Sequence, residues 1–167
     1  MLPITRCAKV VMTLSLAAFA LLVAFNNLTD YGANFAFVQH VLRMDTTSAD
    51  SPARWRALES PGLWHAAYAL IIGWELLVGA LLAAGGIQMW RQRRASAAGF
   101  QRAKQVAMAG FMAAFLLWFT GFAVVGGEWF LMWQSSEWNG QESAFRFAMT
   151  MLGVAIFVNQ SDEIPGD

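Results

Sequence analysis

The sequence has few charged residues and a single cysteine. Of its 167 residues, 13% are Asp, Glu, Lys or Arg, against about 25% in typical soluble domains. Cys7 has no second cysteine to pair with, which excludes an internal disulfide and a small disulfide-stapled scaffold. Eleven basic residues balance eleven acidic ones, so net charge points to no partner. Together with the apolar runs described next, these shortages exclude a disordered chain and a soluble nucleic-acid binder.

Hydrophobic residues are abundant instead, at 57% of the chain, with 8 Trp and 13 Phe. About 20 apolar residues are needed to cross a bilayer. Four segments meet this need, at about 7–25, 63–90, 105–127 and 143–160. We therefore predict an all-α protein, a four-transmembrane-helix bundle that forms a single domain over residues 1–167. Arg6 and Lys9 precede the apolar run of the first segment, as basic residues do in a signal peptide, but the length of the uncharged run favours a retained helix.

Charge differs between the loops that join these segments. Loop 91–104 is basic and has no acidic residue, whereas loop 128–142 is acidic and has no basic residue. Because positive loops stay inside, we expect loop 91–104 and both termini to be cytoplasmic. The basic residues are Arg91, Arg93, Arg94, Arg102 and Lys104, and the acidic residues are Glu128, Glu137 and Glu142.

Two segments, 26–62 and 128–142, then face outside. Tyr31, Phe35, Val38 and Leu42 recur at helical spacing, which predicts a short amphipathic interfacial helix between spans one and two. The second segment is rich in tryptophan, typical of an aromatic belt, and its polar residues suit a cap or a binding surface. These residues are Trp129, Trp133 and Trp138, with Glu128, Asn139 and Gln141. We expect the two segments to pack against each other around His40.

Glu75 lies near the middle of the second span, where a carboxylate is costly. Trp64 and Tyr68 share its helix face, so we expect this face to point into the bundle. Arg146 in the fourth span is the expected ion-pair partner of Glu75, with Glu128 competing for it. A structural role, as an ion pair or a protonated carboxyl, and a proton, cation or ligand site both remain open.

Small residues recur four positions apart in two of the predicted spans. They predict close helix packing, either within one bundle or between two copies of the chain. The pairs are Gly79 with Ala83, Ala80 with Ala84, and Gly110 with Ala114.

His40 and His65 are the imidazoles available for a haem or a metal. Both are predicted near the outer interface, where Asp45 or Glu128 could complete a metal site. The competing interpretation is that each histidine is hydrogen-bonded to its neighbours. The sequence contains no P-loop, GxSxG, CxxC or dinucleotide-binding motif, so we do not expect an enzyme.

Three runs carry a resemblance to a known family: NNLTDYGANFAFVQHVLRMDT, WELLVGALLAAG and GGEWFLMWQSSEWNGQESAFRF. From about residue 8 to 158, the chain resembles an uncharacterised bacterial family of predicted small integral membrane proteins, a domain of unknown function. The resemblance implies a four-span protein of the bacterial inner membrane and implies no activity. The matching positions are Asn27, Asp30, Tyr31, Asn34, His40, Asp45, Glu75, Glu128, Trp129, Trp133, Trp138, Asn139, Gln141 and Arg146.

Three functional hypotheses follow. The leading one is a non-enzymatic accessory or scaffold protein whose outer segments form a binding surface. The second is a small ion or proton transporter or channel that uses Glu75, and the third is a haem-, metal- or quinone-binding redox protein that uses His40 and His65. Membrane lipids are the expected partners, with a partner protein or a second copy of the chain as candidates. No nucleic acid is expected, and the sequence identifies no cofactor.

Overall fold

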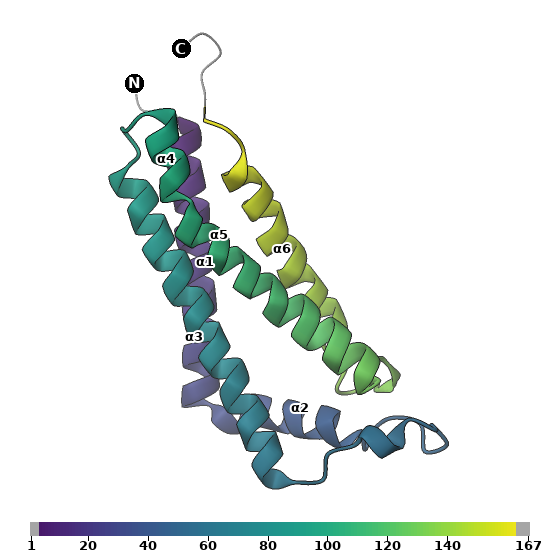
Figure 1. Cartoon of the computed structure of the whole chain (residues 1–167). Coiled ribbons are helices and arrows are strands. Elements are labelled where there is room, and N and C mark those ends of the chain that lie inside the picture. Colours follow the sequence, from purple (N-terminus) through teal and green to yellow (C-terminus); the bar gives the residue numbers. More distant parts are fainter. Residues whose placement is uncertain (1–3, 163–167) are drawn as a thin grey trace.

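Helices account for the regular structure of this protein. The computed structural model describes residues 4–162, and the all-α prediction is confirmed over that range. Four helical stretches run between the same two ends of the molecule (Figure 1). They are α1 (Ile4–Thr29), α3 (Pro61–Arg91), the continuous stretch of α4 (Ala97–Ala103), α5 (Gln105–Phe115) and η2 (Leu116–Trp129), and α6 (Gln141–Asn159).

The two ends of the bundle differ. The predicted interfacial helix is present as α2 (Tyr31–Arg43), which lies across one end, here called the α2 end. Two single-turn helices, η1 (Arg54–Arg56) and η3 (Met132–Gln134), lie in the loops of the same end. The start of α1, the end of α6 and helix α4 lie at the opposite end, here called the α4 end (Figure 1).

Three helical stretches are long and apolar enough to cross a membrane: Ile4–Thr29, Pro61–Arg91 and Ala97–Trp129. The third begins earlier than predicted, because α4 occupies half of the segment expected to be the loop 91–104. The expected fourth span, 143–160, coincides with α6 but is not among these three stretches. Glu142 and Arg146 in the first turns of α6 lower its hydropathy.

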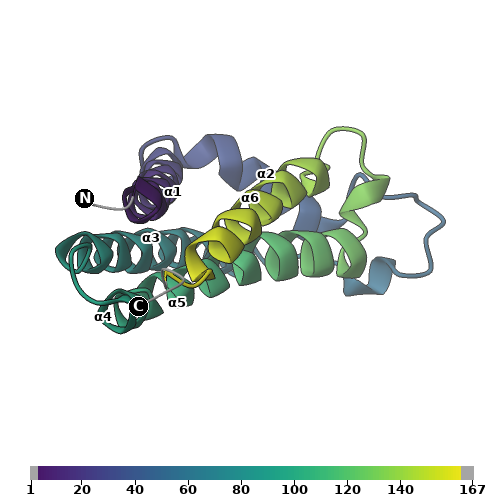
Figure 2. The same ribbon diagram turned by 90° about the horizontal axis from the view of Figure 1, so that it is seen from above.

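Glycines bring α3 close to its neighbours, and α3 packs between α1 and α5 (Figure 2). A Cβ on Gly85 would lie 2.3 Å from the backbone nitrogen of Ala107, so a side chain there would push α3 and α5 apart. Gly79 and Gly110, two of the small residues predicted to mediate packing, approach Leu21 and Leu82 in the same way. Without a hydrophobic drive between helices in lipid, this close approach supplies the packing energy.

The segments at the α2 end pack against each other, as predicted. The His40 ring stacks on the Trp138 indole with ring centroids 4.6 Å apart. The Thr46 hydroxyl donates a hydrogen bond to Ser135 Oγ at 2.9 Å. The side-chain oxygen of Gln134 accepts from the backbone N–H of Ser48 at 3.1 Å. These contacts join α2 and the segment after it to the segment after η2.

The third stretch widens along its length. From Leu116 to Trp129 it is a π-helix, with its i→i+5 pattern continued by the bond from Phe130 N–H to Val125 O. The Trp74 indole N–H donates to the carbonyl of Ala113 at 2.8 Å, three residues before the widening begins. A side chain that takes a carbonyl of the helical ladder is a known cause of such irregularity. Wide helical turns occur frequently at functional sites.

A buried ionic cluster closes the α4 end. The ammonium groups of Lys9 and Lys104 both pair with the carboxylate of Asp162, and both donate to the carbonyl of Gln160, at 2.7 and 2.8 Å. Both lysines are fully buried. Together the two lysines tie the residues after α6 to α1 and to the α4–α5 junction.

Candidate functional site: a carboxylate cleft beneath helix α2

Glu75 points into the bundle from the middle of α3. Its side chain is 3% exposed, and Trp64 and Tyr68 on the same helix face are also buried. The predicted inward orientation of this face is therefore confirmed. Residues three, four and seven positions apart lie on one side of an α-helix, so burying this face carries the carboxylate inward together with the two aromatic rings.

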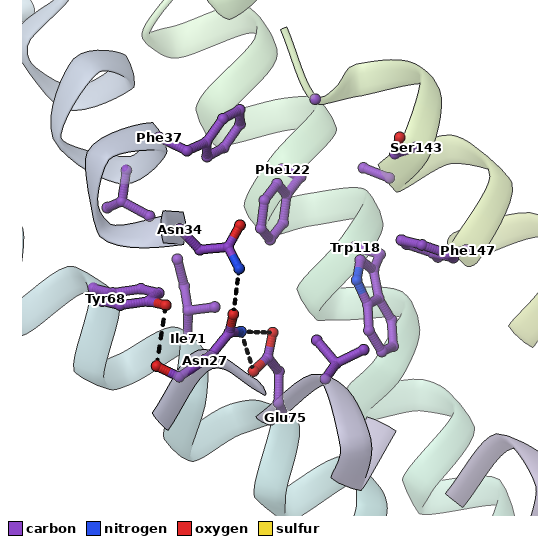
Figure 3. A pocket seen from close by; sticks show the side chains of 14 residues that line it. Asn27, Asn34, Phe37, Tyr68, Ile71, Glu75, Trp118, Phe122, Ser143 and Phe147 are labelled. Atoms are coloured by element: carbon purple, nitrogen blue, oxygen red, sulfur yellow. Dashed lines mark hydrogen bonds between the residues drawn. The ribbon is translucent and has the colours of Figure 1, made fainter. Parts of the chain in front are cut away.

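A chain of amides holds the Glu75 carboxylate (Figure 3). Asn27 Nδ2 donates to both carboxylate oxygens, at 3.0 and 2.8 Å. Asn34 Nδ2 donates in turn to Asn27 Oδ1 at 2.7 Å. The Tyr68 hydroxyl donates to the backbone carbonyl of Asn27 at 3.3 Å. The network thus joins α1, α2 and α3, and orients Asn27 so that its N–H groups face the acid.

The predicted ion pair between Glu75 and Arg146 is wrong. The Arg146 side chain is 65% exposed, lies 3.8 Å from the carboxylate of Glu142 and donates to Ser143 Oγ at 3.2 Å. The rotation of α6 explains this, because its buried face carries Ala148 and Met151. Over residues 4–162, no lysine, arginine or histidine forms an ion pair with Glu75.

A cleft of about 210 Å³ lies beside the carboxylate, between α1, α2, α3, η2 and α6 (Figure 3). Asn34 and Ser143 are exposed, whereas Glu75 is buried, so the cleft leads from an accessible polar rim to the acid. Most of the remaining lining is aromatic or aliphatic. It consists of Val23, Asn27, Phe37, Val38, Tyr68, Ile71, Trp118, Phe122, Gly140, Ala144 and Phe147.

A second, more apolar cavity of about 280 Å³ adjoins this cleft. Phe37, Val38, Ile71 and Phe122 line both spaces. The rings of Phe37 and Phe122 stack with centroids 6.2 Å apart. Both aromatic side chains therefore form part of the wall between the polar cleft and the apolar cavity.

Toward the α4 end, the bundle is closely packed beyond Glu75. Val78, Leu82 and Ala114 are fully buried there. The nearest atoms to a Cβ built on Gly110 belong to Leu82, at 2.9 Å, which shows how tightly α3 and α5 meet. The carboxylate thus lies between a cleft on one side and a closely packed core on the other.

The two histidines lie in separate clusters. Nδ1 of His40 is 2.9 Å from a carboxylate oxygen of Asp45, and its ring stacks on Trp138. His65 Nδ1 forms a 2.8 Å hydrogen bond with the Tyr31 hydroxyl, and its ring stacks on Phe35 with centroids 4.2 Å apart. Each histidine is thus hydrogen-bonded to a neighbouring side chain. Among the residues that the structure describes, no group of three or more His, Cys, Asp or Glu side chains has a metal-site arrangement.

Of the other residues predicted to face outside, some pack against neighbouring segments and others are exposed. Asn139 Oδ1 accepts from the backbone N–H of Gln141, where α6 begins. The Gln141 side chain lies against η2, so closely that a Cβ on Gly127 would be 2.2 Å from its amide nitrogen. Asp30 and Glu128 are exposed, as are Trp129 and Trp133, which are 47% and 51% exposed.

Sequence reasoning missed Asn27 as the partner of Glu75. A signal was present in α1, where Ala17, Ala20 and Ala24 precede Asn27 at intervals of three and four residues. All four are buried and form one helix face. A stripe of small residues that ends in an amide marks a face that another helix can approach closely and bond to. The aromatic walls of the cleft, from Trp118, Phe122 and Phe147, had no comparable signal.

Three long apolar helices around a packed core define an integral membrane protein with several passes. Residues 5–161 match the family described as predicted small integral membrane protein (DUF2165), so the chain belongs to this uncharacterised family. The predicted family resemblance is thereby confirmed. No curated protein and no solved structure matches the chain.

Proposed function

We propose that this protein is a non-enzymatic membrane receptor that binds a small organic cation with an apolar body at Glu75. The observation that carries the proposal is a buried carboxylate with one amide partner beside an aromatic-walled cleft. The leading hypothesis from the sequence was an accessory protein with an outer binding surface. The site geometry supports a binding role inside the bundle instead.

Charge favours a cationic ligand. An ionised carboxylate buried in a membrane protein is costly unless a cation or proton neutralises it. Asn27 supplies hydrogen bonds but no charge, and Arg146, the expected counter-ion, lies elsewhere. Each carboxylate oxygen retains acceptor capacity beyond the bond from Asn27. A ligand ammonium group would supply the missing positive charge.

The walls favour an organic cation over a metal ion. Rings of Trp118, Phe122 and Phe147 line the cleft, and aromatic faces attract ammonium groups while contacting apolar carbon. An inorganic ion would need several oxygen ligands. The adjoining apolar cavity offers room for a hydrocarbon portion across the Phe37–Phe122 pair.

The packed core beyond Glu75 favours binding over conduction. A channel or carrier needs a route from the carboxylate to the opposite face, and Val78, Leu82 and Ala114 occupy that direction. The aromatic cleft and the buried acid form an anchor for a ligand, without an arranged nucleophile or acid–base pair beside it in the described residues.

We further propose four crossings of a bacterial inner membrane, with the α4 end cytoplasmic. Helix α6 runs beside the long helices and exposes Phe145, Leu152 and Ile156, as a lipid-facing helix does. The arginines at the α4 end support a cytoplasmic location by the positive-inside rule. The cleft would then open toward the outer side, beneath α2.

An accessory role at the α2 end is a second candidate. Trp55 is 73% exposed and packs edge-on against Trp129, with ring centroids 6.0 Å apart. The Arg56 guanidinium lies over both rings. These three residues form an exposed aromatic surface that suits the bilayer interface or a protein partner.

Benzyltrimethylammonium tests the main proposal, with neopentylbenzene as its uncharged isostere. Calorimetric titration of the purified protein in detergent should detect the cation and not the isostere. Glu75→Gln keeps the side-chain shape and removes the charge, so it should weaken binding at least about tenfold, since one lost charge interaction of about 1.4 kcal/mol is tenfold. Trp118→Leu should weaken binding severalfold.

Arg146→Gln is the matched control, because it also removes one charge from a helix but lies outside the cleft. Its binding should equal that of the unmodified protein. Equal affinity of the Glu75→Gln variant, or equal binding of neopentylbenzene, would refute the proposal.

A further inference from the structure

We infer that a pocket at the α4 end binds the phosphate headgroup of an anionic phospholipid. This pocket of about 460 Å³ lies between the end of α3 and helix α4, at the opposite end of the bundle from the Glu75 cleft. Gln88, Arg91 and Gln92 line it from the α3 side, and Gly99, Arg102 and Ala103 line it from α4. The inference is independent of the proposed function at Glu75.

The charge of the pocket suits a phosphate. Arg91 and Arg102 face it from two different helices, and no acidic side chain lines it. Within residues 4–162, neither guanidinium takes part in a side-chain hydrogen bond or an ion pair. Asp162, the nearby acid, is buried and already paired with two lysines. Guanidinium groups bind phosphate oxygens in a two-pronged geometry, and the glutamine amides can donate to the remaining oxygens.

The walls of the pocket are held in place. The Arg6 side chain donates to the backbone carbonyls of Arg93 and Ala95, at 3.2 and 2.7 Å, and so fixes the α3–α4 turn to α1. Ser96 Oγ accepts from the backbone N–H of Gly99 at 3.2 Å and thereby caps α4. A rigid turn keeps Arg91 and Arg102 facing one space, which reduces the entropy lost on binding.

The position in the fold favours a lipid over a soluble phosphate. Ile87 precedes Arg91 by four residues and therefore shares its helix face. Ile87 and Trp90 are 45% and 46% exposed, so the last turns of α3 present apolar surface directly below the arginine. A phospholipid can lay an acyl chain along this surface while its phosphate reaches Arg91. Basic pockets between transmembrane helices are known to hold anionic headgroups.

Lipid binding can be measured by native mass spectrometry of the purified protein, with dioleoyl phosphatidylglycerol compared with dioleoyl phosphatidylcholine. Phosphatidylglycerol should bind and phosphatidylcholine should bind far more weakly. Arg91→Gln and Arg102→Gln should each weaken phosphatidylglycerol binding about fivefold, which corresponds to about 1 kcal/mol per basic side chain near a membrane surface. Inorganic phosphate in large excess should leave the lipid bound.

Arg94→Gln is the control of equal charge change, because Arg94 is exposed in the same turn but does not line the pocket. It should retain lipid binding within about twofold, less than the roughly fivefold effect of one basic side chain. Near-UV circular dichroism should show the same tryptophan packing in all variants. An equal loss in Arg94→Gln, equal binding of phosphatidylcholine, or release of the lipid by inorganic phosphate would each overturn the inference.

Discussion

Gly85→Ala should loosen the contact between α3 and α5. The added Cβ would lie 2.3 Å from the backbone nitrogen of Ala107 and 2.6 Å from its Cα, whereas ordinary contacts are 3.4–4 Å. The obstacle is backbone, so no side-chain rotation can relieve it. The two helices must separate by about 1 Å, and their packing weakens over the contact because dispersion falls steeply with distance.

The expected magnitude follows from two opposing terms. Overpacking of a close contact costs about 1–3 kcal/mol, and a backbone obstacle places this site near the upper value. Alanine recovers about 1 kcal/mol of helix propensity relative to glycine. The net loss in free energy of unfolding for Gly85→Ala is therefore about 2 kcal/mol.

Gly73→Ala provides the matched control in the same helix. No atom lies within 4 Å of a Cβ built there, so the substitution should gain up to about 1 kcal/mol from helix propensity alone. Gly86→Ala should fall between the two variants, because the atom it meets is the flexible Leu14 side chain. The order of stability should be Gly73→Ala, then Gly86→Ala, then Gly85→Ala.

Unfolding by sodium dodecyl sulfate in mixed micelles, followed by circular dichroism, measures these differences in free energy. Gly73→Ala and Gly85→Ala should differ by about 3 kcal/mol. Equal stability of these two variants would refute the view that α3 and α5 meet at Gly85.

Two further perturbations test the two ends of the bundle. Asp162→Ala removes the carboxylate shared by Lys9 and Lys104. It should lower the free energy of unfolding by about 3 kcal/mol or more, since two buried charges are left unpaired. An unchanged unfolding curve would show that these ion pairs do not stabilise the α4 end. Trp138→Ala removes the ring that stacks on His40, so amide hydrogen exchange should become faster in α2 but not in α4. Unchanged exchange in α2 would show that this stack does not stabilise the helix.

Much of the fold was predictable because the hydropathy and the residue spacing of each helix can be read from its own sequence. Long apolar runs predict α1, α3 and the α5–η2 stretch, since the bilayer demands a fixed apolar length. Spacing within a helix also predicted that Glu75 shares a buried face with Tyr68. Such predictions need one helix and its own periodicity, and no information about its neighbours.

The partners of Glu75 were not predictable in the same way. Helices that are apolar on nearly all sides show no preferred inward face, so the sequence does not define their rotation in the bundle. Arg146 was expected to turn inward, but α6 buries Ala148 and Met151 and leaves the arginine exposed. Asn27 is the partner of Glu75 instead, because the small residues of α1 allow that helix to lie close to α3.

The sequence by itself therefore determined the class of protein, the approximate positions of its long helices and the presence of an acid within a membrane span. These features depend on hydropathy and on local periodicity. Only the tertiary structure decided that the acid meets Asn27 beside an aromatic cleft, and that Lys9 and Lys104 share Asp162. These contacts join residues 48, 153 and 58 positions apart, and they arise from how the helices rotate and approach one another.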